Sequence, residues 1–313
     1  MAGHLREMAI DVTVVGPGNW GTSLDAALRG AGVPVAEVVG RRAVKGRVVS
    51  MRRAKLDARV IWLCVPDGAI RETAEELVRR RQDFSGKDFS GQIVVHSSGA
   101  LTSEVLEPAR KAGAQVASVH PVMTFPTRDV VPLEGVLFGI ETAGASTRGR
   151  LERLVKKIGG RPFRVDGKKK ALYHAAGTMA SPLIVAALTA AMETARLAGL
   201  DEATAKQWVA ALAVPTVHNL AARGPERSFS GPFARGDAGT IHLHLQALAA
   251  HPILAGVYRA LAEEALAALP VRNRESLAEV LAANNFEAGE ADGAKRLRER
   301  LKPAKSSGRR QEQ

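Results

Sequence analysis

The chain has 313 residues, 46% of them hydrophobic and 4% aromatic, with one cysteine and a formal net charge of +12. This length suffices for two domains with sizeable cores, and one cysteine excludes an intramolecular disulfide or a thiolate metal cluster. No signal-peptide pattern and no apolar run of membrane-spanning length stand out. We therefore expect a cytoplasmic protein without a membrane partner.

Much of the positive charge lies at the end of the chain. Residues 295–313 contain eight Lys and Arg against two Glu, which predicts a disordered basic tail over 291–313. No aromatic residues are interleaved with these charges, as a stacking platform for bases would require. The pattern therefore predicts no nucleic-acid partner.

The first predicted strand, 10–15, leads directly into a G-x-G-x-x-G motif and a helix over 20–30. In the dinucleotide fingerprint the first glycine permits a tight turn, the second lets the backbone approach a pyrophosphate, and the third lets helix and strand pack closely. The helix N-terminus then presents free N–H groups to the anion. An ordinary glycine turn is the alternative. The predicted cofactor-binding residues are Gly16, Pro17, Gly18, Asn19, Trp20 and Gly21.

The second predicted strand, 35–39, is followed by Gly40, Arg41 and Arg42. An NAD site usually has an acidic residue here that binds the ribose hydroxyls. Guanidinium groups instead pair with a 2′-phosphate through charge-assisted hydrogen bonds. The sequence thus favours NADP(H) over NAD(H), with Arg41 and Arg42 as phosphate ligands, and two solvated arginines are the alternative.

Short β-rich runs alternate with helix-like segments as far as residue 165, and alanine- and leucine-rich helical segments follow. The alternation predicts an α/β domain over 1–166, with a Rossmann-type, doubly wound parallel sheet. The helical spacing predicts a separate all-α domain over 167–290 for substrate binding or dimerisation. The remaining strands are expected at 59–65, 92–96, 116–119, 136–140 and 162–165.

Three of these strands end in residues that can contact a cofactor or a substrate. Ligands of open α/β sheets bind beyond the carboxyl ends of the strands. Asp67 either lines the nucleotide or caps the following helix. His120 is a candidate catalytic residue that polarises a carbonyl or accepts a hydroxyl proton, and a structural histidine is equally compatible. The predicted cofactor contacts are Val65, Pro66, Ser97 and Ser98.

The first predicted helix of the second half carries two possible proton donors. Lys170 and His174 are spaced i, i+4 and share a helix face. Both are candidates to protonate a carbonyl oxygen that receives hydride. Further along, Ser181 either faces the substrate or, with Pro182, marks a helix kink.

A second group of polar residues precedes a later predicted helix. Arg235 is a candidate ligand for a substrate carboxylate, and Thr240 is a further substrate contact. Asp237 either orients a catalytic base or caps the helix. No spacing typical of metal ligands is found.

Five motifs, in this order, resemble one family. They are the glycine fingerprint, His-Ser-Ser-Gly-Ala at 96–100, His-Pro-x-x-x-Phe at 120–125, Tyr-His-Ala-Ala at 173–176 and Gly-Pro-x-x-Arg-Gly-Asp at 231–237. The chain resembles the family that joins a Rossmann-like domain to a C-terminal domain of unknown function 2520. Members are often labelled deazaflavin-dependent NADP oxidoreductases by similarity.

This architecture is similar to that of ketopantoate reductase, pyrroline-5-carboxylate reductase and prephenate dehydrogenase. In ketopantoate reductases a lysine near the start of the long helix protonates the alkoxide, and Lys170 is its nearest counterpart. His120 resembles the histidine of the His-Pro-Met in prephenate dehydrogenases, which implies a base for alcohol oxidation. The resemblance also implies a homodimer formed through a helical domain similar to that of 6-phosphogluconate dehydrogenase.

Together these features imply an NADP(H)-dependent oxidoreductase that transfers hydride to or from a small anionic oxo, hydroxy or imino acid. Ketopantoate-type reduction is the first specific hypothesis. Two alternatives stay open, a prephenate-dehydrogenase-like enzyme and a non-catalytic NADP(H)-binding sensor, because a fold alone does not establish a function.

Overall fold

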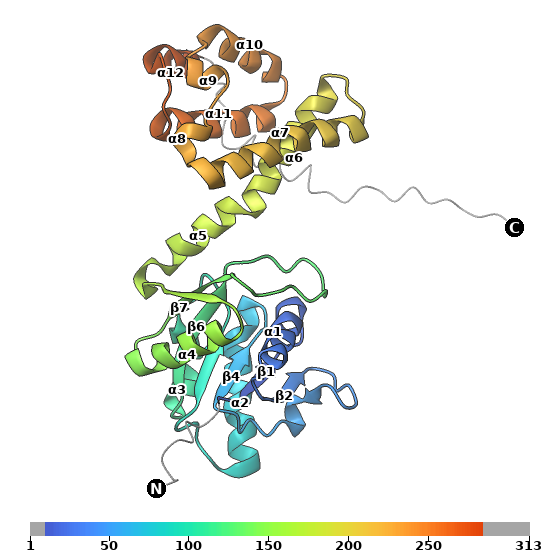
Figure 1. The fold of residues 1–313 in the computed structure, drawn as a ribbon, viewed down its shortest axis with the longest axis vertical. Helices are drawn as coiled ribbons and strands as arrows, with labels where there is room; N and C mark the ends of the chain where they lie inside the picture. Colours follow the sequence, from blue (N-terminus) through green and yellow to red (C-terminus); the bar gives the residue numbers. More distant parts are fainter. Residues whose placement is uncertain (1–9, 284–313) are drawn as a thin grey trace, which may run out of the picture. The chain divides into compact units, whose positions relative to one another are not determined.

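The computed structural model describes residues 10–283, and the chain divides into two compact units between Ser181 and Pro182 (Figure 1). The predicted tail at 291–313 lies outside the described residues. The division comes later than the boundary expected at residue 166, because the next helix, α5 (Lys170–Ala180), is bonded to the first unit. The Lys170 ammonium donates hydrogen bonds to the carbonyls of Ser98 and Gly99.

The first unit contains an eight-stranded sheet in the order β3-β2-β1-β4-β5-β6-β7-β8. Neighbouring strands are parallel except for β6 and β7, which are antiparallel. The predicted α/β fold with a mostly parallel sheet is therefore confirmed, although β3 and the antiparallel pair were not expected. The strands are β1 (Val12–Val15), β2 (Val35–Gly40), β3 (Val49–Ser50), β4 (Val60–Leu63), β5 (Ile93–His96), β6 (Gln115–Pro121), β7 (Leu137–Glu141) and β8 (Arg161–Arg164).

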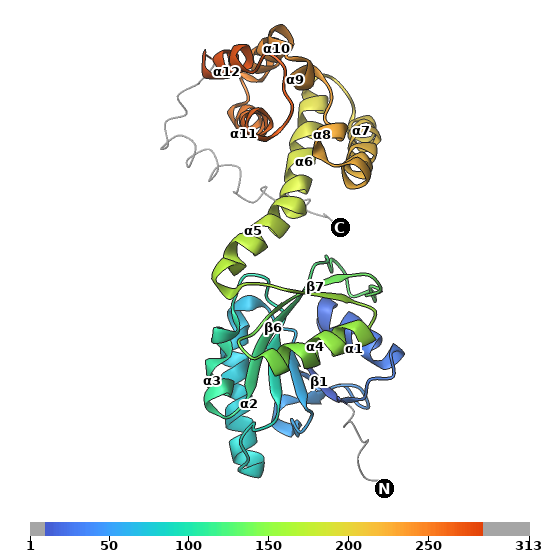
Figure 2. The same ribbon diagram turned by 60° about the vertical axis from the view of Figure 1, so that its left-hand side comes forward.

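Helices cover both faces of this sheet (Figure 2). Val12 and Val14 belong to the core that includes α1 and α4, whereas Ile61 and Leu63 belong to the core that includes α2 and α3. Because successive strand residues point to opposite faces, burial on both sides follows from these apolar runs. The four helices are α1 (Asn19–Gly30), α2 (Ile70–Ser85), α3 (Glu107–Lys111) and α4 (Ala145–Lys157).

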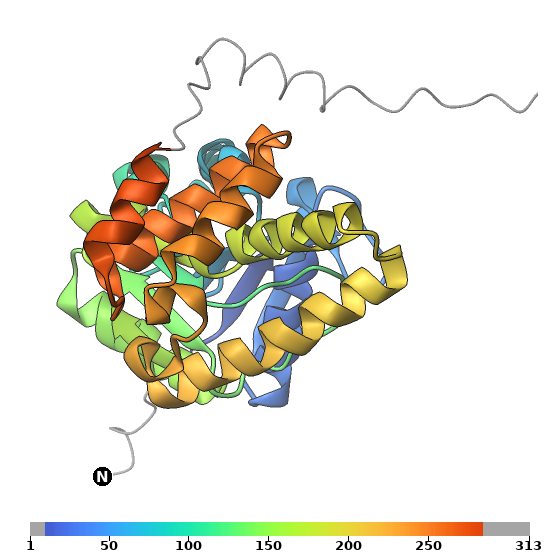
Figure 3. The same ribbon diagram turned by 90° about the horizontal axis from the view of Figure 1, so that it is seen from above.

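In residues 182–283 the second unit consists of helices, as predicted (Figure 3). Its main core joins α10, α11 and α12, with Ile241, Ala262 and Leu277 among the buried residues. Asp201 caps α7 by accepting the Thr204 N–H. The helices are α6 (Pro182–Leu197), α7 (Glu202–Arg223), α8 (Pro225–Ser228), α9 (Pro232–Arg235), α10 (Ala238–Leu248), α11 (Pro252–Ala268) and α12 (Arg274–Ala283).

One stretch of the described chain, Gly167–Leu197, has the length and the mean hydropathy, 1.6, of a membrane-spanning helix. We expected no such stretch. It is interrupted at Ser181, where the backbone leaves the helical region, and its first turn is bonded to the sheet unit. The uninterrupted part, α6, has 16 residues, or about 24 Å of helix, which is shorter than a hydrocarbon core of about 30 Å. The interruption and the attachment both disfavour a membrane span.

Candidate functional site

The turn between β1 and α1 requires glycine at two of its three motif positions. Gly16 has φ +98°, and a Cβ there would lie 2.7 Å from the Cys64 carbonyl oxygen. A Cβ on Gly21 would overlap the carbonyl oxygen of Gly16. These contacts correspond to the tight turn and the close helix–strand packing expected of the dinucleotide fingerprint.

Gly18 is different, because no atom lies within 4 Å of the position that its Cβ would take. It is the N-cap residue of α1, no side chain caps this helix, and its first turn contains no acidic residue. The first N–H groups of a helix need partners from outside it, and phosphate oxygens are suitable acceptors. An open glycine and an uncapped helix end therefore fit a pyrophosphate.

The end of β2 lies beside this turn. A Cβ on Gly40 would be 3.3 Å from Pro17, and the exposed Arg41 and Arg42 follow directly. Glu37, the acidic residue of β2, accepts hydrogen bonds from the backbone N–H groups of Lys55 and Leu56. Its carboxylate is thus already bonded within the protein, while the two arginines stand at the position expected of ribose-phosphate ligands.

Asn19 and Trp20 connect the start of α1 to two other segments. The Asn19 side chain donates to the Phe125 carbonyl (2.8 Å), and the Trp20 indole donates to the Ser97 hydroxyl (2.7 Å). The Trp62 indole donates to the same hydroxyl (2.8 Å). Three predicted cofactor-binding residues, Asn19, Trp20 and Ser97, therefore have structural hydrogen bonds of their own.

Ser98 is the centre of a second network, after β5. Its hydroxyl donates to the Asp67 carboxylate (2.7 Å). Asp67 is therefore not a helix cap, and Pro66 occupies the N-cap position of the turn Asp67–Ala69. The Lys170 ammonium, 1% exposed, donates to the carbonyls of Ser98 (2.6 Å) and Gly99 (3.0 Å). Val65, the other predicted contact here, lies against Gly16.

Two histidines and a tyrosine surround Gly99. The His120 Nδ1 is hydrogen-bonded to the Tyr173 hydroxyl at 2.7 Å, and the rings of His120 and His174 are 6.0 Å apart. A Cβ on Gly99 would overlap His174 and would lie 2.9 Å from the His120 Nε2. The absence of a side chain at Gly99 thus allows the two imidazoles to approach this loop.

Burial sets the protonation of these groups. It lowers the pKa of His120 to about 4, assisted by the positive charge of Lys170, and lowers the pKa of His96 to about 4 for the same two reasons. Burial also lowers the pKa of Lys170 to about 8, although the carboxylates of Glu141 and Asp67 oppose this change. His120 is therefore neutral at pH 7, and its Nε2 is either a donor or an acceptor.

The remaining predicted residues lie at or beyond the end of the first unit. Ser181 follows α5 and marks the helix break. Asp237 caps α10, since its carboxylate accepts the N–H and the hydroxyl of Thr240 (3.1 and 2.7 Å). The capping alternative for Asp237 is thus confirmed, and Thr240 is its partner. Arg235, the last residue of α9, is exposed.

Sequence reasoning gave no role to Tyr173 and Glu141. Tyr173 follows Lys170 by one helical turn, which places both on a similar face of α5. That spacing, next to His174, was an available signal. Glu141 accepts the N–H and the hydroxyl of Ser103 (2.6 and 3.0 Å). Its position at the end of the antiparallel strand β7 could not be placed, because the sequence does not specify that pairing.

Similarity to known proteins agrees with this architecture. No curated protein is significantly similar in sequence. TM1727 from Thermotoga maritima is 21% identical, with a TM-score of 0.64, over 88% of this chain and 100% of that one. BF3122 from Bacteroides fragilis, provisionally named an NADP oxidoreductase, is 19% identical with a TM-score of 0.64. The match covers 82% of this chain and 97% of BF3122. A reductive aminase from Aspergillus terreus, in complex with NADPH, is 15% identical with a TM-score of 0.59. The match covers 87% of this chain and 99% of the reductive aminase.

Two family models match the chain, one within the first unit and one that extends from the first unit into the second. Residues 1–121 match the Rossmann-like domain, and residues 136–265 match a domain of unknown function, DUF2520. The resemblance expected from the five motifs is thereby confirmed. The chain joins a match to the Rossmann-like domain to a match to DUF2520, and its fold is similar to that of a provisionally named NADP oxidoreductase.

Proposed function

We propose that this protein is an NADP(H)-dependent oxidoreductase that acts on a small anionic oxo, hydroxy or imino acid. The observation that carries the proposal is a single sheet edge with two features. The uncapped start of α1 follows β1, and His120, bonded to Tyr173, lies near the carboxyl end of β6. Both are at carboxyl ends of strands, where ligands of such sheets bind.

The cofactor would be held by the glycine turn and by the residues after β2. The N–H groups at the start of α1 would bind the pyrophosphate, and Arg41 and Arg42 would bind the 2′-phosphate. NADP(H), when bound, supplies or accepts the hydride. The engagement of Glu37 by backbone N–H groups supports NADP(H) over NAD(H).

His120 would act on the oxygen or nitrogen of the substrate. If Tyr173 donates to Nδ1, the Nε2 carries the proton and donates to the group that gains charge when hydride is added. If Tyr173 accepts from Nδ1, the Nε2 has a lone pair that takes a proton when the substrate is oxidised. A phenol can do both, so one pair serves both directions.

Lys170 would position the loop at Ser98 and Gly99 rather than protonate the substrate. Its ammonium is already bonded to two carbonyls of the loop that contacts His120 and His174. It therefore fixes the distance between this loop and α5. For the substrate carboxylate we propose Arg235, which is exposed and forms no ion pair within residues 10–283.

We also propose that the protein is a cytoplasmic homodimer, formed through α6 and α7. These helices expose large apolar side chains, among them Val185 (65%), Trp208 (52%) and Leu212 (56%). Several large exposed apolar side chains on two helices are typical of an interface, and a second copy of the chain presents the same side chains.

The proposed activity is tested by NADPH oxidation with ketopantoate and a panel of related 2-oxo and imino acids. We expect turnover with at least one acid, and we expect Arg235→Gln to raise KM by about tenfold or more with a smaller change in kcat. The matched control is Arg227→Gln, at another exposed arginine of the second unit. NADPH binding without turnover on any substrate would favour the sensor alternative.

A further inference from the structure

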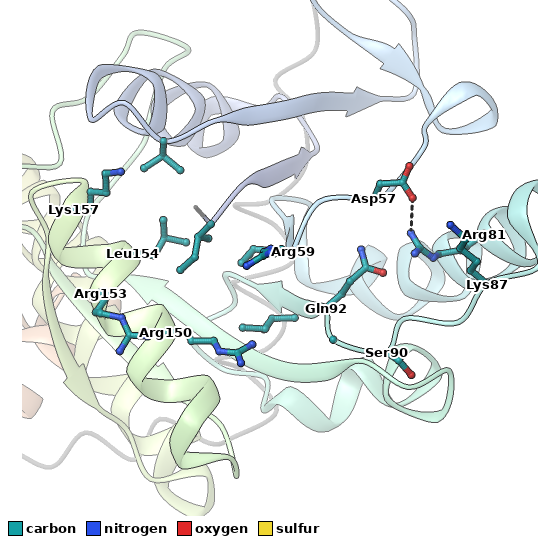
Figure 4. Close-up of a pocket in the computed structure, with 15 residues that line it drawn as sticks. Asp57, Arg59, Arg81, Lys87, Ser90, Gln92, Arg150, Arg153, Leu154 and Lys157 are labelled. Carbon is teal, nitrogen blue, oxygen red and sulfur yellow. Dashed lines mark hydrogen bonds and ion pairs between the residues drawn. The ribbon is translucent and has the colours of Figure 1, made fainter. Parts of the chain in front are cut away.

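A pocket of about 900 Å³ lies at the other end of the sheet (Figure 4). Val60 and Ile93, the first residues of β4 and β5, line it together with Ile10 before β1. The glycine turn, in contrast, follows the last residue of β1. The pocket is therefore separate from the proposed cofactor and substrate site.

The pocket is strongly basic. Only one carboxylate, that of Asp57, is among its lining residues, and it already pairs with Arg81 at 3.4 Å. The nearby Asp88 accepts both the N–H and the hydroxyl of Ser90. The acidic groups of this region are thus bonded within the protein. The six cationic lining residues are Arg59, Arg81, Lys87, Arg150, Arg153 and Lys157.

Two buried side chains build one wall of the pocket. Arg81, 8% exposed, donates to the carbonyls of Asp88 and Leu56, so its guanidinium is held in place. Gln92, 6% exposed, donates through its Nε2 to the carbonyls of Leu56 and Ala58. Its Oε1 is buried and has no hydrogen-bond partner. A buried acceptor without a donor is uncommon in proteins.

The opposite wall is a face of α4. Arg150, Arg153 and Lys157 are exposed, line the pocket and form no ion pair within the described chain. Their i, i+3, i+7 spacing places them on one helix face over about 10 Å. Such a row offers separate partners to more than one anionic group.

We propose that this pocket binds a small polyanion that carries two or more phosphate groups. The phosphates would pair with the row on α4 and with Lys87 through charge-assisted hydrogen bonds. None of the lining residues is aromatic, so the pocket offers no stacking platform for the bases of a nucleic acid. The ligand is therefore assigned as a small molecule.

The test is a calorimetric titration of the full chain with tripolyphosphate at low salt. We expect saturable binding, which Arg150→Gln/Arg153→Gln weakens by about tenfold or more. The matched control is Arg79→Gln/Lys156→Gln, which removes the same charge from exposed residues outside the pocket. We expect it to change the dissociation constant by less than about twofold.

Three outcomes would overturn the proposal. They are no binding of tripolyphosphate, equal weakening by the two double variants, or tighter binding of a single-stranded oligonucleotide that depends on Arg150 and Arg153. NADPH titrated into the same variants separates the two sites. We expect its affinity to be unchanged by Arg150→Gln/Arg153→Gln whether or not the proposed oxidoreductase activity is found.

Discussion

At the scale of single residues, His96 and His120 are held neutral by burial. Both have a pKa of about 4, below the value near 6.5 of an unfolded chain. As the pH falls from about 6.5 to about 4, the unfolded chain therefore binds protons that the folded chain does not. The stability contributed by the neutral histidines is present above pH 6.5 and is lost through this window.

We predict that the free energy of unfolding falls on the order of a few kcal/mol between pH 6.5 and pH 4. Urea unfolding at several pH values measures it. His120→Asn removes one of the two groups, so the variant should show a smaller fall over the same window. An unchanged pH dependence in this variant would show that His120 is not held neutral.

The Tyr173 hydroxyl fixes the orientation of the His120 ring through its hydrogen bond to Nδ1. We predict that Tyr173→Phe lowers kcat/KM by about 10- to 100-fold without changing the affinity for NADPH. Tyr258→Phe is the matched control, because Tyr258 is bonded to His244 in the second unit at 2.9 Å. Steady-state kinetics and NADPH titration distinguish the effects. Similar losses in both variants would argue against a specific role for Tyr173.

At the scale of elements, the sequence predicts strands and helices best where apolar periodicity and glycine chemistry agree. β1 and α1 were expected at 10–15 and 20–30 and are found at Val12–Val15 and Asn19–Gly30. The helix kink that Ser181 and Pro182 offered as one alternative is found as the break after α5. The antiparallel pairing of β7 was harder to predict, because it depends on a connection that leaves no local signature.

The candidate site was likewise predictable in part from the sequence. The spacing i, i+4 identified Lys170 and His174, and the strand ends identified Ser98 and His120. The structure brings these residues to one loop at Gly99. Sequence alone could not show that the Lys170 ammonium is bonded to backbone carbonyls, because that depends on how α5 meets the loop after β5.

The glycine turn gives a prediction at the same scale. Gly18→Ala should fold normally and should weaken NADPH binding by about tenfold or more, because its Cβ meets no protein atom but would occupy the space of a pyrophosphate. Gly21→Ala should instead lower stability by on the order of 2 kcal/mol or more, because its Cβ overlaps Gly16.

Thermal unfolding and NADPH titration separate these two variants. Gly30→Ala, at the end of α1 with open space around it, serves as the control for both measurements. Normal NADPH affinity in Gly18→Ala would contradict the assignment of the pyrophosphate to this turn.

At the scale of the whole molecule, we expect a second copy of the chain to cover the exposed apolar side chains of α6 and α7. We predict a dimer by light scattering and a monomer for Trp208→Glu/Leu212→Glu. Val44→Glu/Phe84→Glu, at exposed apolar residues of the first unit (50% and 57%), should remain dimeric. A monomeric wild-type protein would contradict the proposed interface. Recovery of the protein in the membrane fraction would instead indicate that Gly167–Leu197 spans a membrane.

The most direct test of the central claim is a calorimetric titration of the full chain with NADPH and with NADH. We expect NADPH to bind at least about tenfold more tightly than NADH. Arg41→Gln/Arg42→Gln should remove this preference, and Arg52→Gln/Arg53→Gln, at two other exposed arginines, should keep it. If neither nucleotide binds, the assignment of the glycine turn as a cofactor site is wrong, and the proposed oxidoreductase function is wrong with it.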